Sequence, residues 1–185
     1  MPGSPKVICV IGAECTGKTV LVRQLADALG GSVVPEVLRD WCAARGRTPQ
    51  QHEQAALLQA QLDQEEQALA RVDTTQDALV LADTGPLLTA VYSLQYFADG
   101  SLLATAHAHH RRYALTLWLQ PDLPWVADGL QRDGSATQWA VHQLLAHHLA
   151  HHQRVVPIAG EGPQRLQAAL AALASISNRR QQTKG

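Results

Sequence analysis

The chain is poor in residue types whose abundance would point to particular classes of protein. Aromatic residues make up only 4% of its 185 residues, as four Trp, three Tyr and one Phe. Its charges nearly balance, with 15 basic and 16 acidic residues, whereas a duplex-binding protein usually carries a basic excess or a basic stripe. We therefore expect no nucleic acid among its partners.

Long hydrophobic runs and paired cysteines are also missing. No apolar run reaches the roughly 18 residues of a transmembrane helix, and the opening MPGSPKVICVIG lacks the order of a signal peptide. The three cysteines, Cys9, Cys15 and Cys42, form no CxxC pair, which is typical of a reducing compartment. We expect a cytoplasmic protein with no membrane contact.

What is present is the composition of one globular domain, with 46% apolar and 17% charged residues. We expect a single domain over residues 1–175 and a polar, frayed tail over 176–185. Apolar runs predict strands at 6–11, 32–36, 77–83, 113–119 and 154–160. Helical patterns fall at 18–29, 38–45, 49–72, 87–97, 101–111, 135–152 and 162–173. This alternation predicts an α/β fold with three layers, α/β/α, around a five-stranded parallel sheet.

Finer features of three helices follow from the sequence. In the helix 18–29, one apolar side is expected from Val20, Leu21, Leu25 and Leu29. Two helices are expected to start with a capping box, one from Thr48 to Gln51 with Pro49 as first helical residue, the other from Ser135 to Gln138. The long Gln/Glu-rich helix 49–72 could pack against a partner, as in a homo-oligomer, or cover the sheet.

The segment GAECTGKT, Gly12–Thr19, satisfies the pattern GxxxxGK[ST] between a strand and a helix. Glycines let backbone N–H groups turn toward phosphate oxygens, and the helix N-terminus adds partial positive charge. Lys18 can reach the β- and γ-phosphates of a nucleotide, and the Thr19 hydroxyl can join a Mg²⁺ shell. We expect ATP to contact Gly12, Glu14, Cys15, Thr16, Gly17, Lys18, Thr19 and Val20.

Such a P-loop needs a second acidic group to hold its metal. Asp83 ends the apolar strand ALVLA, as this residue should. We expect Thr19 and Asp83 to bind Mg²⁺, although a strand-ending Asp can also be a helix cap or a turn residue.

The chain resembles the nicotinamide riboside kinase domain of NadR-type proteins in four segments: GAECTGKT, PEVLRDW, LADT and PWVADGLQRDGS. The resemblance runs from about Val7 to Leu173. It implies a nucleoside- or nucleotide-kinase-like P-loop fold, with ATP and Mg²⁺ as co-substrates. It also implies phosphoryl transfer to the 5′-hydroxyl of nicotinamide riboside. NadR-type proteins often carry an adenylyltransferase unit before the kinase, which we do not expect here because the P-loop begins at Gly12.

Glu36 and Arg39 follow the second predicted strand, at the sheet edge where α/β proteins bind ligands. Glu36 could accept the proton of the attacking hydroxyl, bind a ribose hydroxyl, or simply start a helix. Arg39 could contact substrate or phosphate, or pair with Glu36 on the surface.

A positively charged, flat nicotinamide ring would favour a pocket that combines aromatic surface with carboxylates. Candidate aromatic residues are Trp41, Tyr92, Tyr96 and Phe97, with Tyr92 and Tyr96 on one helix face. Core packing is the alternative role for each of them.

The segment 125–135 resembles the lid that closes over ATP in this family, with Arg132 as a catalytic charge stabiliser. The position after DGL is usually arginine in the family and is Gln131 here, and a further family arginine corresponds to Trp139. Arg111 or Arg112 could compensate. The second acidic residue that often follows the strand-ending Asp is replaced by Gly85.

Histidines and one cysteine complete the candidate residues. The pairs His147/His151 and His148/His152, with three more histidines in 107–110, have spacing that can bind zinc. No acidic or cysteine ligand completes that set, so a solvated helix face is expected. Cys15 lies inside the phosphate loop, where thiolate is favoured.

Three functional hypotheses remain open on the sequence. The first is a nicotinamide riboside kinase, and the second a kinase for another nucleoside or small metabolite. The third is a P-loop ATP-binding regulatory module with no small acceptor.

Overall fold

The computed structural model describes residues 5–72, 78–125 and 134–182, with side chains to residue 175. Five strands form one parallel sheet in the order β2-β3-β1-β4-β5. Their bounds are β1 Lys6–Ile11, β2 Ser32–Val34, β3 Leu79–Asp83, β4 Leu115–Leu119 and β5 Val155–Ile158. The predicted five-stranded parallel sheet is confirmed.

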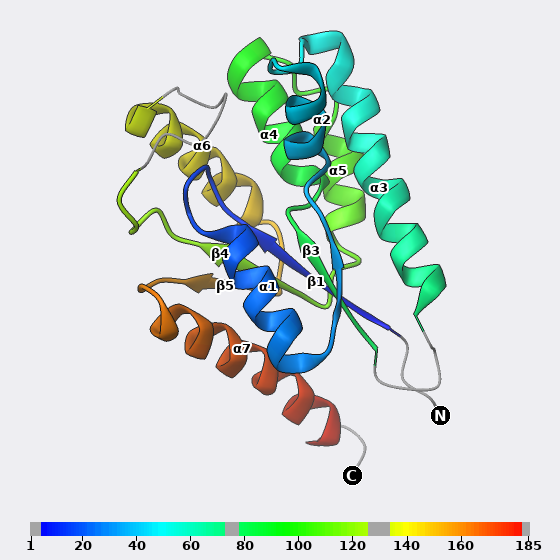
Figure 1. Ribbon diagram of the computed structural model, residues 1–185, viewed down its shortest axis with the longest axis vertical. Helices are drawn as coiled ribbons and strands as arrows, with labels where there is room; N and C mark the ends of the chain where they lie inside the picture. Colours follow the sequence, from blue (N-terminus) through cyan, green and yellow to red (C-terminus); the bar gives the residue numbers. More distant parts are fainter. Residues whose placement is uncertain (1–4, 73–77, 126–133, 183–185) are drawn as a thin grey trace.

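Helices cover both faces of this sheet (Figure 1). They are α1 Lys18–Leu29, α2 Val37–Arg45, α3 Gln54–Arg71, α4 Pro86–Phe97, α5 Leu103–His110, α6 Gly134–Leu149 and α7 Pro163–Gln182, with a 3₁₀ turn at Gln51–Glu53. Helices α1 and α7 pack on one face, and α2 to α6 pack on the other. The three-layer α/β/α architecture is therefore confirmed.

Alternation along β1 creates the two halves of the core. Val7, Cys9 and Ile11 point to the side of α2 to α6, whereas Ile8 and Val10 point to the side of α1 and α7. All five side chains are buried because β1 is the central strand of the sheet. The strand is thereby fixed from both sides, and the loop that follows Ile11 is held at its carboxyl end.

The expected apolar side of α1 is partly wrong. Leu21 and Leu25 are buried, but Val20 is 60% exposed and Leu29 is 45% exposed. The third buried apolar residue is Val22 instead. At about 100° per residue, the face of α1 turned to the sheet passes through residues 21, 22 and 25, and residue 20 falls outside it.

Neither expected capping box forms. The first lies two residues later: the backbone N–H of Gln50 donates to the Glu53 carboxylate at 2.8 Å, and the chain enters a 3₁₀ turn before α3. Helix α6 begins at Gly134, so Ser135 is already inside it. Gln138 is buried and bonds another segment instead of its own helix start.

Two other boundaries differ from the expectations. Helix α6 ends at Leu149, before His152, and α7 continues to Gln182 through much of the expected tail. Helix α3 covers the sheet, with Leu57 and Leu58 in the core. Within the described residues, no helix is both long and apolar enough to span a membrane.

Candidate phosphate site and adjoining cavity

The loop Gly12–Thr19 follows β1 and turns directly into α1. Gly17 has a φ of 79°, a left-handed conformation that glycine adopts without steric cost, and Cys15 has a φ of 55°. The Thr16 hydroxyl donates to the Ala13 carbonyl at 2.8 Å and braces the loop. The result is a tight curve at a helix N-terminus, the geometry in which backbone N–H groups bind phosphate.

Lys18 is buried at the start of α1 and folds back over this loop. Its ammonium donates to the Ala13 carbonyl at 3.1 Å. A buried ammonium of this kind is held beside the space that the loop encloses, where a phosphate group would accept its hydrogen bonds.

Thr19 and Asp83, 64 residues apart in the sequence, are brought into direct contact. The Thr19 hydroxyl donates to Asp83 Oδ2 at 2.6 Å. Asp83 is 3% exposed, and its other oxygen, Oδ1, has no hydrogen-bond partner among the described residues. A hydroxyl and a carboxylate with a spare oxygen are ligands that suit Mg²⁺, so these residues fit the expected metal.

The turn after Asp83 is unusually constrained. Thr84 has a φ of 81°, which is rare for a β-branched residue and is found mostly at functional sites. At Gly85, an added Cβ would lie 2.6 Å from the Tyr113 hydroxyl. A side chain therefore does not fit at the position where the resembling family often has an acidic residue.

Glu36 sits at the start of α2 and is 7% exposed, with no capping hydrogen bond from its side chain. Burial raises the pKa of its carboxyl group; Lys18 opposes this rise, and Asp83 adds to it. Glu36 is thus close enough to Lys18 and to Asp83 to respond to both charges. Arg39 is half exposed and pairs with Glu36, Nε to Oε2, at 3.7 Å.

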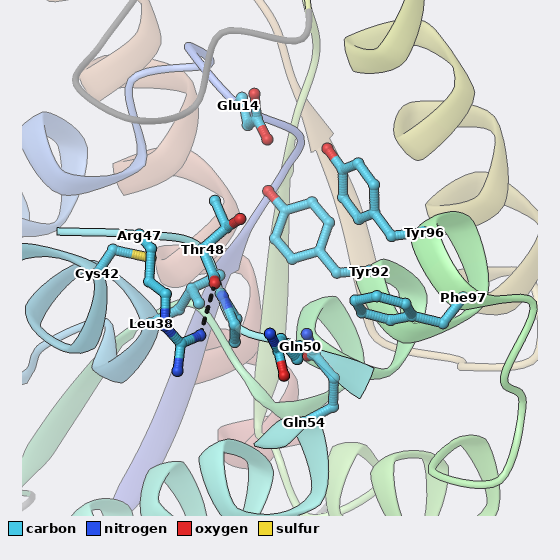
Figure 2. Close-up of a pocket in the computed structure, with 11 residues that line it drawn as sticks. Glu14, Leu38, Cys42, Arg47, Thr48, Gln50, Gln54, Tyr92, Tyr96 and Phe97 are labelled. Atoms are coloured by element: carbon cyan, nitrogen blue, oxygen red, sulfur yellow. Dashed lines mark hydrogen bonds between the residues drawn. The ribbon is translucent and has the colours of Figure 1, made fainter. Parts of the chain in front are cut away.

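A cavity of about 490 Å³ opens beside the phosphate loop (Figure 2). Glu14 of the loop lines one side, and Tyr92, Tyr96 and Phe97 of α4 line another. The remaining lining residues, from α2, the following loop and the start of α3, are Leu38, Cys42, Arg47, Thr48, Pro49, Gln50 and Gln54. The volume lies in the range of small-molecule sites.

Aromatic and acidic groups meet in this cavity. The rings of Tyr92 and Tyr96 are 6.0 Å apart, and in Figure 2 both hydroxyl ends point toward the side of Glu14. Burial, and then the Glu14 and Glu36 carboxylates, raise the pKa of Tyr92, so its phenol stays protonated. The positive charge of Arg47 is offset by Glu53, which accepts two hydrogen bonds of 2.7 Å from it.

Some expected residues lie elsewhere. Trp41 does not line the cavity and is instead covered by the guanidinium groups of Arg45 and Arg47, at 4.4 and 4.9 Å from its ring. Arg132 and Gln131 lie outside the described residues, as does most of the expected lid. Trp139 is half exposed on α6.

Arg111 and Arg112 cannot take the place of a lid arginine. They precede β4, at the amino ends of the strands, whereas the phosphate loop follows the carboxyl end of β1. Because all five strands are parallel, the two arginines lie at the opposite edge of the sheet.

The histidines do not form the solvated face that their spacing suggested. His147 and His151 are exposed, but His148 and His110 are buried where α5 and α6 meet. His107 contacts His152 at 2.9 Å and His148 at 3.1 Å through its two ring nitrogens. No group of three or more potential ligands within the described segments is arranged to hold a metal ion.

Two residues around the phosphate loop were not singled out from the sequence. The Gln138 amide donates to the Glu14 carbonyl at 2.7 Å and ties α6 to the loop. Arg165 of α7 is buried, donates to the Thr16 and Gly160 carbonyls, and pairs with Asp122. In the sequence, the spacing of Gln138 suggested only a capping box. Nothing about Arg165, a single arginine in an Ala-rich helix, indicated a contact with the phosphate loop.

This geometry defines the class of the protein: it is a P-loop nucleotide-binding fold, with the phosphate loop, its lysine and an acidic strand end in one place. The chain belongs to the protein family described as "AAA domain", which it matches over residues 7–165. A comparison with curated proteins found no match.

Solved structures share the fold. A structure described as NadR protein in complex with NR has a TM-score of 0.77 at 22% identity, over 94% of this chain and 51% of that chain. NadR in complex with NAD and AMP-PNP gives a TM-score of 0.76 at 22% identity, over 95% and 50% of the two chains. The chain thus spans about half the length of these proteins. A deoxyadenosine kinase from M. mycoides gives 0.64 at 12% identity, over 92% and 99%.

The phosphate loop also offers a simple chemical test through Cys15. Cys15 is half-buried in the loop, whereas Cys9 and Cys42 are buried. We expect iodoacetamide to label Cys15 first, and saturating MgATP to slow that labelling by at least about tenfold, because exposure governs thiol reactivity. Mass spectrometry of the labelled peptide measures the rate, and Cys15→Ser is the control. Equal rates with and without MgATP would contradict the assignment of the loop as a nucleotide site.

Proposed function

We propose that the protein is an ATP- and Mg²⁺-dependent phosphotransferase whose acceptor is the 5′-hydroxyl of nicotinamide riboside, with nicotinamide mononucleotide as product. The observation that carries this proposal is that Glu14 belongs to both the phosphate loop and the wall of the adjoining cavity. A nucleotide on the loop and a nucleoside in the cavity would therefore meet at one point.

The nucleotide would be bound by backbone N–H groups of the loop and by charged side chains. The loop amides and Lys18 would bind the phosphate tail of ATP, and Thr19 and Asp83 would hold Mg²⁺, which neutralises phosphate charge when bound. Val20 is exposed directly after the loop, where a bound nucleotide can contact it. Arg165 supports the far side of the loop through the Thr16 carbonyl.

Glu36 is the residue that we propose accepts the proton of the attacking hydroxyl. Burial raises the pKa of its carboxyl group, which makes it a better proton acceptor than an exposed carboxylate. Arg39 is half exposed and pairs with Glu36. Phosphoryl transfer depends mainly on positioning and charge stabilisation, so Glu36 orients the hydroxyl as well as accepting its proton.

The character of the cavity supports a cationic, flat ring as the acceptor's base. Tyr92, Tyr96 and Phe97 supply aromatic surface, and Glu14 supplies negative charge beside it. Cations are attracted both to aromatic faces and to carboxylates. NadR, which shares the fold, has been solved in complex with NR and, separately, with NAD and AMP-PNP.

The reaction itself is tested with MgATP and a panel of nucleosides that includes nicotinamide riboside and deoxyadenosine, followed by detection of phosphorylated product. We expect nicotinamide mononucleotide to form fastest, and Lys18→Ala to lower its formation by at least about 100-fold because the loop lysine stabilises transferring charge. Undiminished product with Lys18→Ala would indicate a contaminating kinase. ADP release without any new phosphoester would favour a regulatory ATP-binding module, and preference for another nucleoside would reassign the acceptor.

The role of Glu14 is tested by comparing nicotinamide riboside with its uncharged dihydro form. In Glu14→Gln we expect KM for the cationic riboside to rise about 3- to 30-fold, in line with the loss of one cation-binding group. The dihydro form should change by less than about twofold, since it carries no ring charge. Glu66→Gln, an exposed carboxylate on α3, is the control. An equal rise in KM for both substrates would mean that Glu14 does not distinguish the charged ring from the uncharged one.

A further inference from the structure

A second cavity lies at the amino ends of the strands, at the opposite edge of the sheet from the phosphate loop. It has a volume of about 310 Å³. Its walls come from the end of α5, the start of β4 and the loop between α6 and β5. The lining residues are His110, Arg111, Tyr113, Thr116, His151, His152, Gln153 and Arg154.

The lining of this cavity is basic. Two arginines and three histidines contribute to it, and no Asp or Glu does. In the part of the chain that the structure describes, no ion pair joins Arg111 or Arg154 to a carboxylate, whereas the neighbouring Arg112 lies 3.7 Å from Glu66. Burial is the largest cause that lowers the pKa of His152, and the positive charges of Arg111 and His151 lower it further. The positive charge of the lining is therefore that of Arg111 and Arg154, and Glu65, which accepts a hydrogen bond from the Tyr113 hydroxyl, is not itself a lining residue.

His110 provides a second, independent indication that the cavity binds a ligand. Its side chain is 2% exposed, and Nδ1 is buried with no hydrogen-bond partner among the described residues. The other nitrogen, Nε2, lies 2.9 Å from the Thr116 hydroxyl. Burial and the neighbouring histidines lower the pKa of His110 to about 3, so its ring is neutral.

His110 lines the cavity, so a ligand held there is a candidate acceptor for its ring. When Thr116 donates its hydroxyl proton to Nε2, the neutral ring carries its own proton on Nδ1. An Nδ1–H without a partner at this depth is costly unless an acceptor reaches it. An anion held in the cavity beside His110 would supply an acceptor and would also accept hydrogen bonds from Arg111 and Arg154.

We propose that this basic cavity, formed by His110, Arg111, His152 and Arg154, binds a small phosphate-bearing anion. Phosphate presents several oxygens to donors that converge from different directions, and arginine is well suited to bind it. The volume lies near the lower end of small-molecule sites, which fits a short phosphate ester or free phosphate. The site is separate from the proposed kinase site and does not depend on that activity.

The test follows the histidine ring signals by NMR while inorganic phosphate or glycerol 3-phosphate is added. Mg²⁺ and AMP-PNP are kept saturating so that the phosphate loop is filled, and acetate at equal ionic strength is the control anion. We expect saturable shifts of the His110 and His152 signals with one or both phosphate probes and none with acetate. Tighter binding of glycerol 3-phosphate would identify an ester as the ligand class, and tighter binding of inorganic phosphate would identify the free anion.

Variants distinguish binding in this cavity from general attraction of an anion to positive charge. Arg111→Gln and Arg154→Gln should each weaken the binding of the better probe by about tenfold, as expected for losing a hydrogen bond to a charged group. Arg112→Gln removes the same charge from the adjacent residue, which does not line the cavity, and should change affinity by less than about twofold. Non-saturating shifts, equal shifts with acetate, or equal weakening by Arg112→Gln would overturn the proposal.

Discussion

The hydrogen bond between the Thr19 hydroxyl and Asp83 Oδ2 is the contact on which the arrangement of the site depends. Thr19 is in the first turn of α1, and Asp83 ends β3. Because β1 and β3 are parallel neighbours with Val10 opposite Asp83, their carboxyl ends meet at one edge. The bond at 2.6 Å holds the start of α1, with Lys18 and the Thr19 hydroxyl, against the carboxylate at the end of β3.

Other packing contacts maintain that frame. Thr84 holds a strained backbone conformation immediately after Asp83, and Gly85 lets the Tyr113 ring pack directly against the turn. Gln138 binds the loop from the α6 side, and Arg165 binds it from the α7 side. Helices from both faces of the sheet thus support a loop whose own sequence is rich in small residues, and this support keeps its amides directed at one point.

The cavity acquires its chemistry from elements that the sheet topology assembles. Residues of α2, α3 and α4 converge beside Glu14, although they are far apart in the sequence. One helix, α6, reaches from the phosphate loop at Gln138 to the histidine cluster near the basic cavity. The two sites that we propose, one for phosphoryl transfer and one for anion binding, therefore lie at opposite ends of the strands.

Much of this fold could be predicted because its signals are local. Apolar strand runs, helical spacing and the phosphate loop each depend on a few neighbouring residues. The position of Asp83 at a strand end indicated that it would lie close to Thr19 of the phosphate loop. The basic cavity could not be predicted in this way. It depends on how the ends of α5 and α6 meet, where His107 contacts His148. Spacing within one helix does not show which face is covered.

The same limit explains the errors at individual residues. Gln138 has the spacing of a capping residue, but α6 begins one residue early and the amide reaches the phosphate loop. Trp41 is aromatic and follows the second strand, yet two arginines cover its ring. Long-range partners such as these decide the role of a side chain, and they are set by tertiary packing.

Calorimetric binding of AMP-PNP, with and without Mg²⁺, to the wild-type protein and to Asp83→Asn tests whether Thr19 and Asp83 hold the metal beside the nucleotide. We expect Mg²⁺ to tighten binding by about tenfold or more in the wild type, because Thr19 and Asp83 would hold the ion against the phosphates. In Asp83→Asn that gain should disappear while binding without Mg²⁺ persists. No heat of binding in the wild type would mean that the loop does not bind a nucleotide, and an equal gain from Mg²⁺ in both proteins would mean that Asp83 does not hold the metal.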